Sequence, residues 1–178
     1  MNTRHLLLWA SLALTMPLAA QTPQEDFKRD ITLSGSNYVA YRGPQKQLTP
    51  APKGYKPFYL SHYGRHGSRF MIGKKAYDVP YFSLLKAKQE GKLTAKGEET
   101  LAKVKMIREE AKGRDGELTP LGALQHQGIT KRMMERFPEI FAGNTNIEAR
   151  STLVIRCILS MENGLQQMLR MNPKLHIF

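Results

Sequence analysis

The strongest constraint on the fold is a long amphipathic stretch near the C-terminal end, residues 144–173. Apolar side chains recur there with a helical spacing of about 3.6 residues, at Val154, Cys157, Ile158, Met161, Leu165 and Leu169. A helix with one apolar stripe must bury it against another element, so the stretch predicts a helix packed in a layered fold. Ser151 or Thr152 is a candidate N-cap, and Pro173 marks the end. The next residues, "KLHIF" (174–178), predict the start of a strand.

Two further helices are predicted from similar start signals. "LTAKGEETL" begins at Leu93 and "LTPLGALQ" at Leu118, and each places a Thr before a helical pattern. The first helix is expected to run to about Ala111, and the second to end before Pro138. The expected core stripe of the second helix is Leu121, Leu124, Gly128, Met133 and Phe137. A shorter helix is expected over residues 81–90.

The segment before these helices contains a candidate buried strand. "KPFYLSHY", residues 56–63, is short, apolar and aromatic, as is typical of a strand inside a sheet. Residues 21–57 are rich in Gly, Pro, Ser and Asn without a sustained period, which predicts a loop-rich lead-in.

The first residues of the chain have the pattern of an export signal. Arg4 precedes an apolar stretch from Leu6 to Leu14, and small residues follow at Ala19 and Ala20. We predict that residues 1–20 are a signal peptide, that residues 21–178 form the mature domain, and that this domain is periplasmic or secreted. An uncleaved N-terminal anchor is the alternative. No later stretch approaches the ~20 apolar residues of a membrane span.

The charge of the chain favours anionic partners. Its 178 residues include 27 Lys and Arg against 15 Asp and Glu, a net charge of +12. Phosphate esters, nucleic acids and anionic surfaces all fit this charge. Basic residues are not interleaved with aromatic ones along a helix or sheet, which argues against nucleic acid. The single Cys157 cannot form an internal disulfide and is expected to be a small core residue.

The motif "GRHGSRF", residues 64–70, groups the side chains that phosphoryl transfer requires. Arg65 and Arg69 flank His66, and a guanidinium binds two phosphoryl oxygens at once and stays charged. A neutral imidazole among them can attack phosphorus and form phosphohistidine. Gly67 lets backbone and phosphate approach closely. Arg150, expected just before a helix N-terminus, is a further candidate anion ligand.

These residues carry a resemblance to the histidine phosphatase superfamily. "RHGSR" resembles its signature, "LTPLG" its helix opening, and "RSTLVIRCILS" its later stretch in which Arg and then Ser follow R-S-T. The matches occur in the expected order over residues 55–170. Within the superfamily the chain resembles the acid phosphatase and phytase branch, most closely the multiple inositol polyphosphate phosphatase group.

The resemblance implies a mixed α/β sheet flanked by helices, with a helical insertion that residues 80–115 would begin. It implies that His66 is the nucleophile, that Arg65, Arg69 and Arg150 bind the phosphoryl group, and that no metal or other cofactor takes part. The expected reaction is hydrolysis of small phosphomonoesters such as inositol phosphates. Arg156 is interpreted as tying its helix to neighbouring backbone, and His126 as a surface or packing residue.

One part of the superfamily pattern is missing from the sequence. Members carry a second histidine and an acidic proton donor, in the form His-Asp or His-Ala-Glu. None of His62, His126 and His176 is followed in that way. We therefore expect the chain to be the N-terminal part of such a phosphatase, with an incomplete core. The alternative is a catalytically inactive remnant that only binds phosphate esters.

Overall fold

The computed structural model describes residues 23–41, 43–44 and 46–178. The chain divides into two units, Met1–Ala40 and Tyr41–Phe178. The predicted signal peptide, residues 1–20, lies outside the described residues. No helix in the described ranges is both long enough and apolar enough to cross a membrane.

The first unit corrects the prediction of a loop-rich lead-in over residues 23–38, whereas the described residues from 39 to 57 hold no helix or strand. It contains helix α2 (Pro23–Arg29) and the 3-10 helix η1 (Ile31–Tyr38). These helices lack an apolar period, but α2 has charged residues in its end turns and η1 has a side-chain cap at its start. Acidic residues occupy the first turn of α2 and basic residues its last turn, as the helix dipole favours. Asp30 Oδ1 then accepts hydrogen bonds from the amide and hydroxyl of Thr32, at 3.0 and 2.6 Å, at the start of η1.

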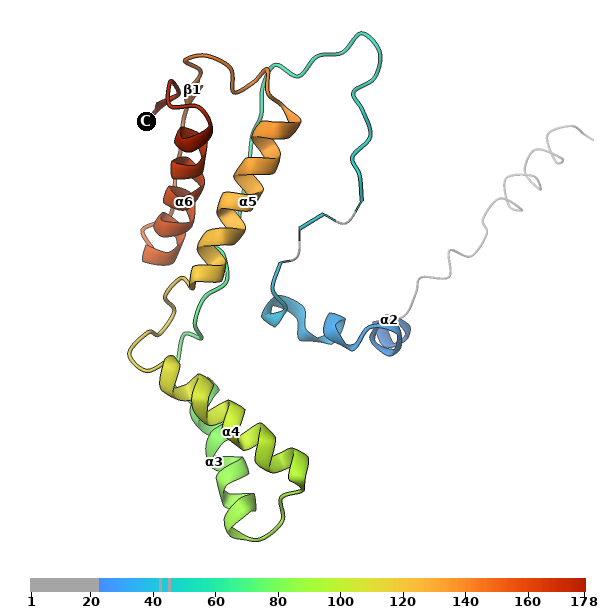
Figure 1. The fold of residues 1–178 in the computed structure, drawn as a ribbon, viewed down its shortest axis with the longest axis vertical. Coiled ribbons are helices and arrows are strands. Elements are labelled where there is room, and N and C mark those ends of the chain that lie inside the picture. The colour runs from blue at the N-terminus through green and yellow to red at the C-terminus, as the bar shows by residue number, and fades with distance from the viewer. Residues whose placement is uncertain (1–22, 42, 45) are drawn as a thin grey trace, which may run out of the picture. The chain divides into compact units, whose positions relative to one another are not determined.

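The second unit holds the other described elements, in the chain order α3, α4, α5, β1, α6, β2. These are α3 (Lys75–Gln89), α4 (Ala95–Glu110), α5 (Pro120–Arg136), β1 (Asn146–Ile147), α6 (Ile155–Met171) and β2 (His176–Ile177). Helices α3 and α4 pack together, as do α5 and α6, which run side by side in the same direction (Figure 1). The strand predicted at the end of the chain is β2, which pairs in parallel with β1. Because α6 connects them, β1, α6 and β2 form a βαβ unit.

The two predicted Thr caps are confirmed. Thr94 Oγ1 accepts a hydrogen bond from Gly97 N, and Thr119 Oγ1 accepts one from Gly122 N, both at 3.1 Å. Helix α4 ends one residue before Ala111, and α5 ends before Pro138, as the sequence indicates. Each cap satisfies an amide that the first helical turn leaves without an intrahelical partner.

The starts of α3 and α6 differ from the predicted ones. Helix α3 begins at Lys75, before the predicted residue 81, and includes Pro80. Helix α6 begins at Ile155, and Val154 is its N-cap without a side-chain hydrogen bond. The hydroxyl of the predicted cap Ser151 instead donates to the carbonyl of Thr152, at 2.9 Å.

The predicted buried strand over residues 56–63 is wrong. These residues have no strand assignment, Phe58 is 95% exposed, and Tyr63 is fully exposed. A strand needs a neighbour for its amides and carbonyls, and in the described chain the one ladder between named strands is β1–β2. Leu60 does pack on the apolar core, so the segment is anchored by this side chain rather than by sheet pairing.

Small residues, rather than the predicted leucines, form the contact between α5 and α6. Leu121 and Leu124 are exposed, whereas Thr130 of α5 and Ser160 and Gly164 of α6 are buried. A Cβ added at Gly164 would lie 3.0 Å from Thr130 Oγ1, so the helices approach too closely there for larger side chains. The sheet prediction is confirmed only as a small parallel pair beside a helix-rich core. That core centres on Met134, Phe141 and Leu175.

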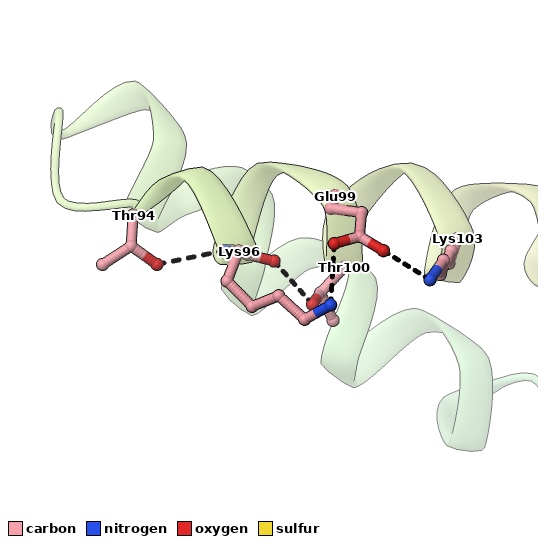
Figure 2. A network of polar contacts seen from close by, with 6 residues as sticks. Thr94, Lys96, Glu99, Thr100 and Lys103 are labelled. Carbon is pink, nitrogen blue, oxygen red and sulfur yellow. Dashed lines mark hydrogen bonds and ion pairs between the residues drawn. The ribbon is translucent and has the colours of Figure 1, made fainter.

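Many of the lysines on the surface of α3 and α4 are paired with acids. Glu99 receives Lys96 at 2.7 Å and Lys103 at 2.5 Å, and the Thr94 cap lies at the start of the same helix (Figure 2). Lys88 of α3 likewise contacts Glu98 of α4 at 2.6 Å. These pairs offset local positive charge, so this surface is a solvated mixture of both signs rather than a basic patch.

Residues 68–71 and 116–119 close the loop that carries α3 and α4. Thr119 N donates to Ser68 O at 2.9 Å, Phe70 N to Glu117 O at 2.9 Å, and Gly116 N to Met71 O at 3.0 Å. This antiparallel pairing places the end of the "GRHGSRF" motif directly beside the start of α5.

Candidate functional site

The imidazole of His66 has a defined orientation. Its Nδ1 lies 2.8 Å from the carbonyl oxygen of Gly67. Because a carbonyl only accepts hydrogen bonds, Nδ1 carries the proton. In the neutral ring the lone pair is then on Nε2, the atom that a nucleophilic histidine uses in this tautomer. The side chain is half-buried.

Two glycines hold the motif against α5 by backbone contact. A Cβ added at Gly67 would lie 2.4 Å from Gly122 O, and one added at Gly122 would lie 2.2 Å from Ser68 O. Real side chains do not tolerate such distances, and backbone atoms cannot swing aside. The loop that carries His66 therefore packs directly on the first turn of α5.

The amides of the motif are held by polar side chains from both long helices. Gly67 N donates to Ser160 Oγ of α6 at 3.0 Å, and this hydroxyl, 2% exposed, donates to the carbonyl of Arg156. Ser68 N donates to Gln125 Oε1 of α5 at 2.8 Å. Side chains from the second turns of α5 and α6 thus meet at the motif.

Three buried donor atoms near this junction have no hydrogen-bond partner in the described part of the chain: Arg69 Nε, Gln125 Nε2 and Arg156 Nε. Leaving a buried donor unpaired costs about 1–3 kcal/mol. Arg69 and Gln125 are tied to the motif and its neighbours by their other polar atoms, at 2.8 Å each. Donors with unused hydrogen-bonding capacity are of the kind that an oxyanion accepts.

Arg65 and Arg150, the other two predicted ligands, lie in different settings. Arg65 is exposed, and its carbonyl oxygen is 3.0 Å from His126 Nε2. The Arg150 side chain is 87% exposed and forms an ion pair with Glu148. It precedes α6 by several residues, and no contact recorded among the described residues joins it to the motif. The structure thus brings Arg65, His66 and Arg69 together with α5 and leaves Arg150 apart.

Three further residues lie at or beside the motif in the structure: Gln125, His126 and Arg156. A signal for Arg156 was present, since Arg156 and Ser160 are four residues apart and therefore share one face of a helix. Gln125 and His126 could not be assigned from sequence, because their contacts join residues 57 and 61 positions apart.

His126 has a shifted protonation equilibrium. Burial lowers its pKa below the ordinary value of 6.5, and the charges of His62 and His66 act in the same direction, while the hydrogen bond to Arg65 opposes them. The ring is therefore largely neutral at pH 7.

Among the described residues no group of three or more His, Cys, Asp or Glu side chains could hold a metal ion.

No protein-family model matches the chain, and no curated protein matches it. The solved structures do give a likeness, and it supports a histidine phosphatase-like fold. One similar structure is that of a Bifidobacterium longum multiple inositol polyphosphate phosphatase in complex with inositol hexasulfate, with a TM-score of 0.56 and 26% sequence identity. The match covers 76% of this chain and 29% of that one, so this chain spans less than a third of its length.

Proposed function

We propose that this chain is part of a histidine-type phosphatase that hydrolyses phosphomonoesters through a phosphohistidine on His66. The observation that carries the proposal is the hydrogen bond between Nδ1 of His66 and the carbonyl of Gly67, which leaves Nε2 as the basic ring nitrogen. The likeness to a multiple inositol polyphosphate phosphatase supports the same class of reaction.

The proposed reaction has two steps. Nε2 of His66 attacks phosphorus, the bond from phosphorus to the ester oxygen breaks, and the leaving oxygen takes its electron pair and a proton. Water then attacks the phosphohistidine, which releases inorganic phosphate and restores the imidazole. Arg65 and Arg69 would stabilise the charge on the non-bridging oxygens.

Arg150 remains a predicted phosphate ligand, and Arg156 is a second candidate for the same role. The unpartnered, buried Nε of Arg156, one helical turn before Ser160, favours Arg156. If this is correct, Arg156→Ala weakens binding of inorganic phosphate by at least about tenfold, as expected for loss of a charge-assisted contact. Arg150→Ala is the matched control, and a larger loss in that variant would return the role to Arg150.

Phosphorylated inositols are the proposed substrates, and the periplasm or the outside of the cell is the proposed location. The net charge of +12 and the inositol hexasulfate bound by the similar structure support the substrate class. The pattern of residues 1–20 supports export.

Trapping the covalent intermediate tests the proposal. The full chain is incubated with 2,4-dinitrophenyl phosphate, whose leaving group needs no protonation, and acid-labile phosphohistidine is quantified by mass spectrometry. We expect label on His66, none in His66→Ala, and normal labelling in His176→Ala, which removes an exposed histidine. Labelling that persists in His66→Ala would overturn the proposal.

A phosphate-binding chain without turnover is the second candidate. The rates at which different leaving groups are released distinguish the two candidate functions. A catalytic chain without the donor should release dinitrophenol far faster than phenol, since general acid catalysis contributes about 10²- to 10⁴-fold. A remnant would bind phosphate but release neither alcohol.

A further inference from the structure

We infer that His126 is a positioning residue for phosphorylation of His66, an inference that rests on the proposed function. His126 lies on α5, 61 residues from the atom that it contacts, and its Nε2 is 3.0 Å from the carbonyl oxygen of Arg65. Because that carbonyl can only accept, Nε2–H of His126 donates.

The contacted carbonyl belongs to the peptide group that joins Arg65 to His66. A donor held on a helix fixes the plane of this peptide and therefore the direction in which the His66 side chain leaves the backbone. On the other side of His66, the amide of Ser68 is held by Gln125 and Gly67 rests on Gly122. Consecutive side chains of α5, Gln125 and His126, thus bracket the nucleophile.

His126 is suited to this role rather than to attack on phosphorus. In the neutral ring, Nε2 is committed as a donor to Arg65, and the ring is half-buried. The titratable groups whose charges act on it are His62 and His66, and together with burial they disfavour its cationic form. The ring therefore contributes a directed hydrogen bond without a permanent charge.

Substitutions that differ in the reach of their donor test this role. The amide nitrogen of Gln can occupy the place of Nε2, that of Asn is too short to reach it, and Leu has no donor. We expect His126→Leu and His126→Asn to slow formation of phosphohistidine from 2,4-dinitrophenyl phosphate about ten- to a hundredfold, the scale of a ~1 Å misplacement. His126→Gln should stay within about threefold of the unmodified chain.

The same samples separate positioning from stability and from phosphate binding. Thermal unfolding and affinity for inorganic phosphate should be similar in the Gln and Asn variants, since His126 does not act on the phosphoryl group directly. Equal labelling rates in the Asn, Gln and unmodified chains would overturn the inference while leaving the proposed function intact. Failure of the unmodified chain to label at all would overturn the proposed function itself.

Discussion

At the scale of single residues, the site depends on places where no side chain fits. Gly67 and Gly122 bring two backbone segments together, and a Cβ on either would meet backbone atoms at 2.4 and 2.2 Å. This contact holds the loop that carries His66 directly against the first turn of α5. The orientation of His66, the proposed nucleophile, therefore depends on the packing of neutral backbone.

We predict that Gly122→Ala destabilises the fold by about 1–3 kcal/mol, the usual cost of overpacking a tight contact. Urea denaturation monitored by circular dichroism measures this free energy of unfolding. Gly73→Ala is the matched control, since a Cβ at Gly73 meets nothing within 4 Å. Equal stabilities for the two variants would contradict the close contact between α5 and the motif.

The candidate site could be predicted in part from sequence. Arg65, His66 and Arg69 can be named as candidates from sequence because a loop motif keeps its members together whatever the surrounding fold. Ser160 and Gln125 reach the motif only through the packing of α6 and α5. Hydrogen-bond partners so far apart in the chain leave no local pattern, and for this reason their roles needed the structure.

At the scale of elements, the Thr caps of α4 and α5 differ in the number of hydrogen bonds that they form. Thr94 and Thr119 each accept from an amide three residues on, at 3.1 Å. Thr119 Oγ1 also donates to Ser68 O at 2.9 Å and so binds the motif to the helix. The Thr94 cap therefore stabilises only the start of α4, whereas Thr119 also holds the motif against α5.

Alanine substitutions should distinguish the two caps. Thr94→Ala is expected to cost about 1 kcal/mol of unfolding free energy, the usual value of a lost cap. Thr119→Ala should cost about 2 kcal/mol, because a hydrogen bond worth ~1 kcal/mol is lost as well. Thr119→Ser retains both contacts and should recover most of the loss. Equal costs at Thr94 and Thr119 in urea denaturation would argue against the second contact.

The ion pairs of α4 predict a small pH dependence. Hydrogen bonds from Lys103 and Lys96 lower the pKa of Glu99 from 4.5. A lowered folded-state pKa means stabilisation that is present above the unfolded value and is lost as the pH falls through the folded one. The loss of melting temperature from pH 7 to pH 3 should therefore be slightly smaller in Glu99→Gln than in the unmodified chain. Glu110→Gln, on the same helix, is the control, and an equal change in both variants would contradict the assignment.

Elements were predictable from sequence where their signals are local. The bounds of α4 and α5 follow from Thr caps, proline and charge, all within one or two turns. The strand expected over residues 56–63 was wrong because its apolar character reports burial only if neighbouring strands exist. Sheet pairing depends on distant segments, and the described ladder between named strands pairs β1 with β2.

At the scale of the whole molecule, the aromatic segment over residues 55–63 offers exposed backbone outside helices and strands. Tyr55, Phe58, Tyr59 and Tyr63 are all exposed. Brief digestion with chymotrypsin should cut first within this segment, because proteases favour exposed backbone outside helices and ladders. Mass spectrometry of the first fragments identifies the site. A first cut inside α5 or α6 would show that the segment is protected in solution.

The paired residues 68–71 and 116–119 also bear on how such a chain can diversify. Their backbone bonds hold together both ends of the segment that carries α3 and α4. The segment between those ends can change in length or sequence without moving His66, because the backbone hydrogen bonds between residues 68–71 and 116–119 hold its two ends in place. If His66 is the nucleophile, as proposed, the hairpin of α3 and α4 is a place where substrate preference could change, by evolution or by design, while His66 stays in place.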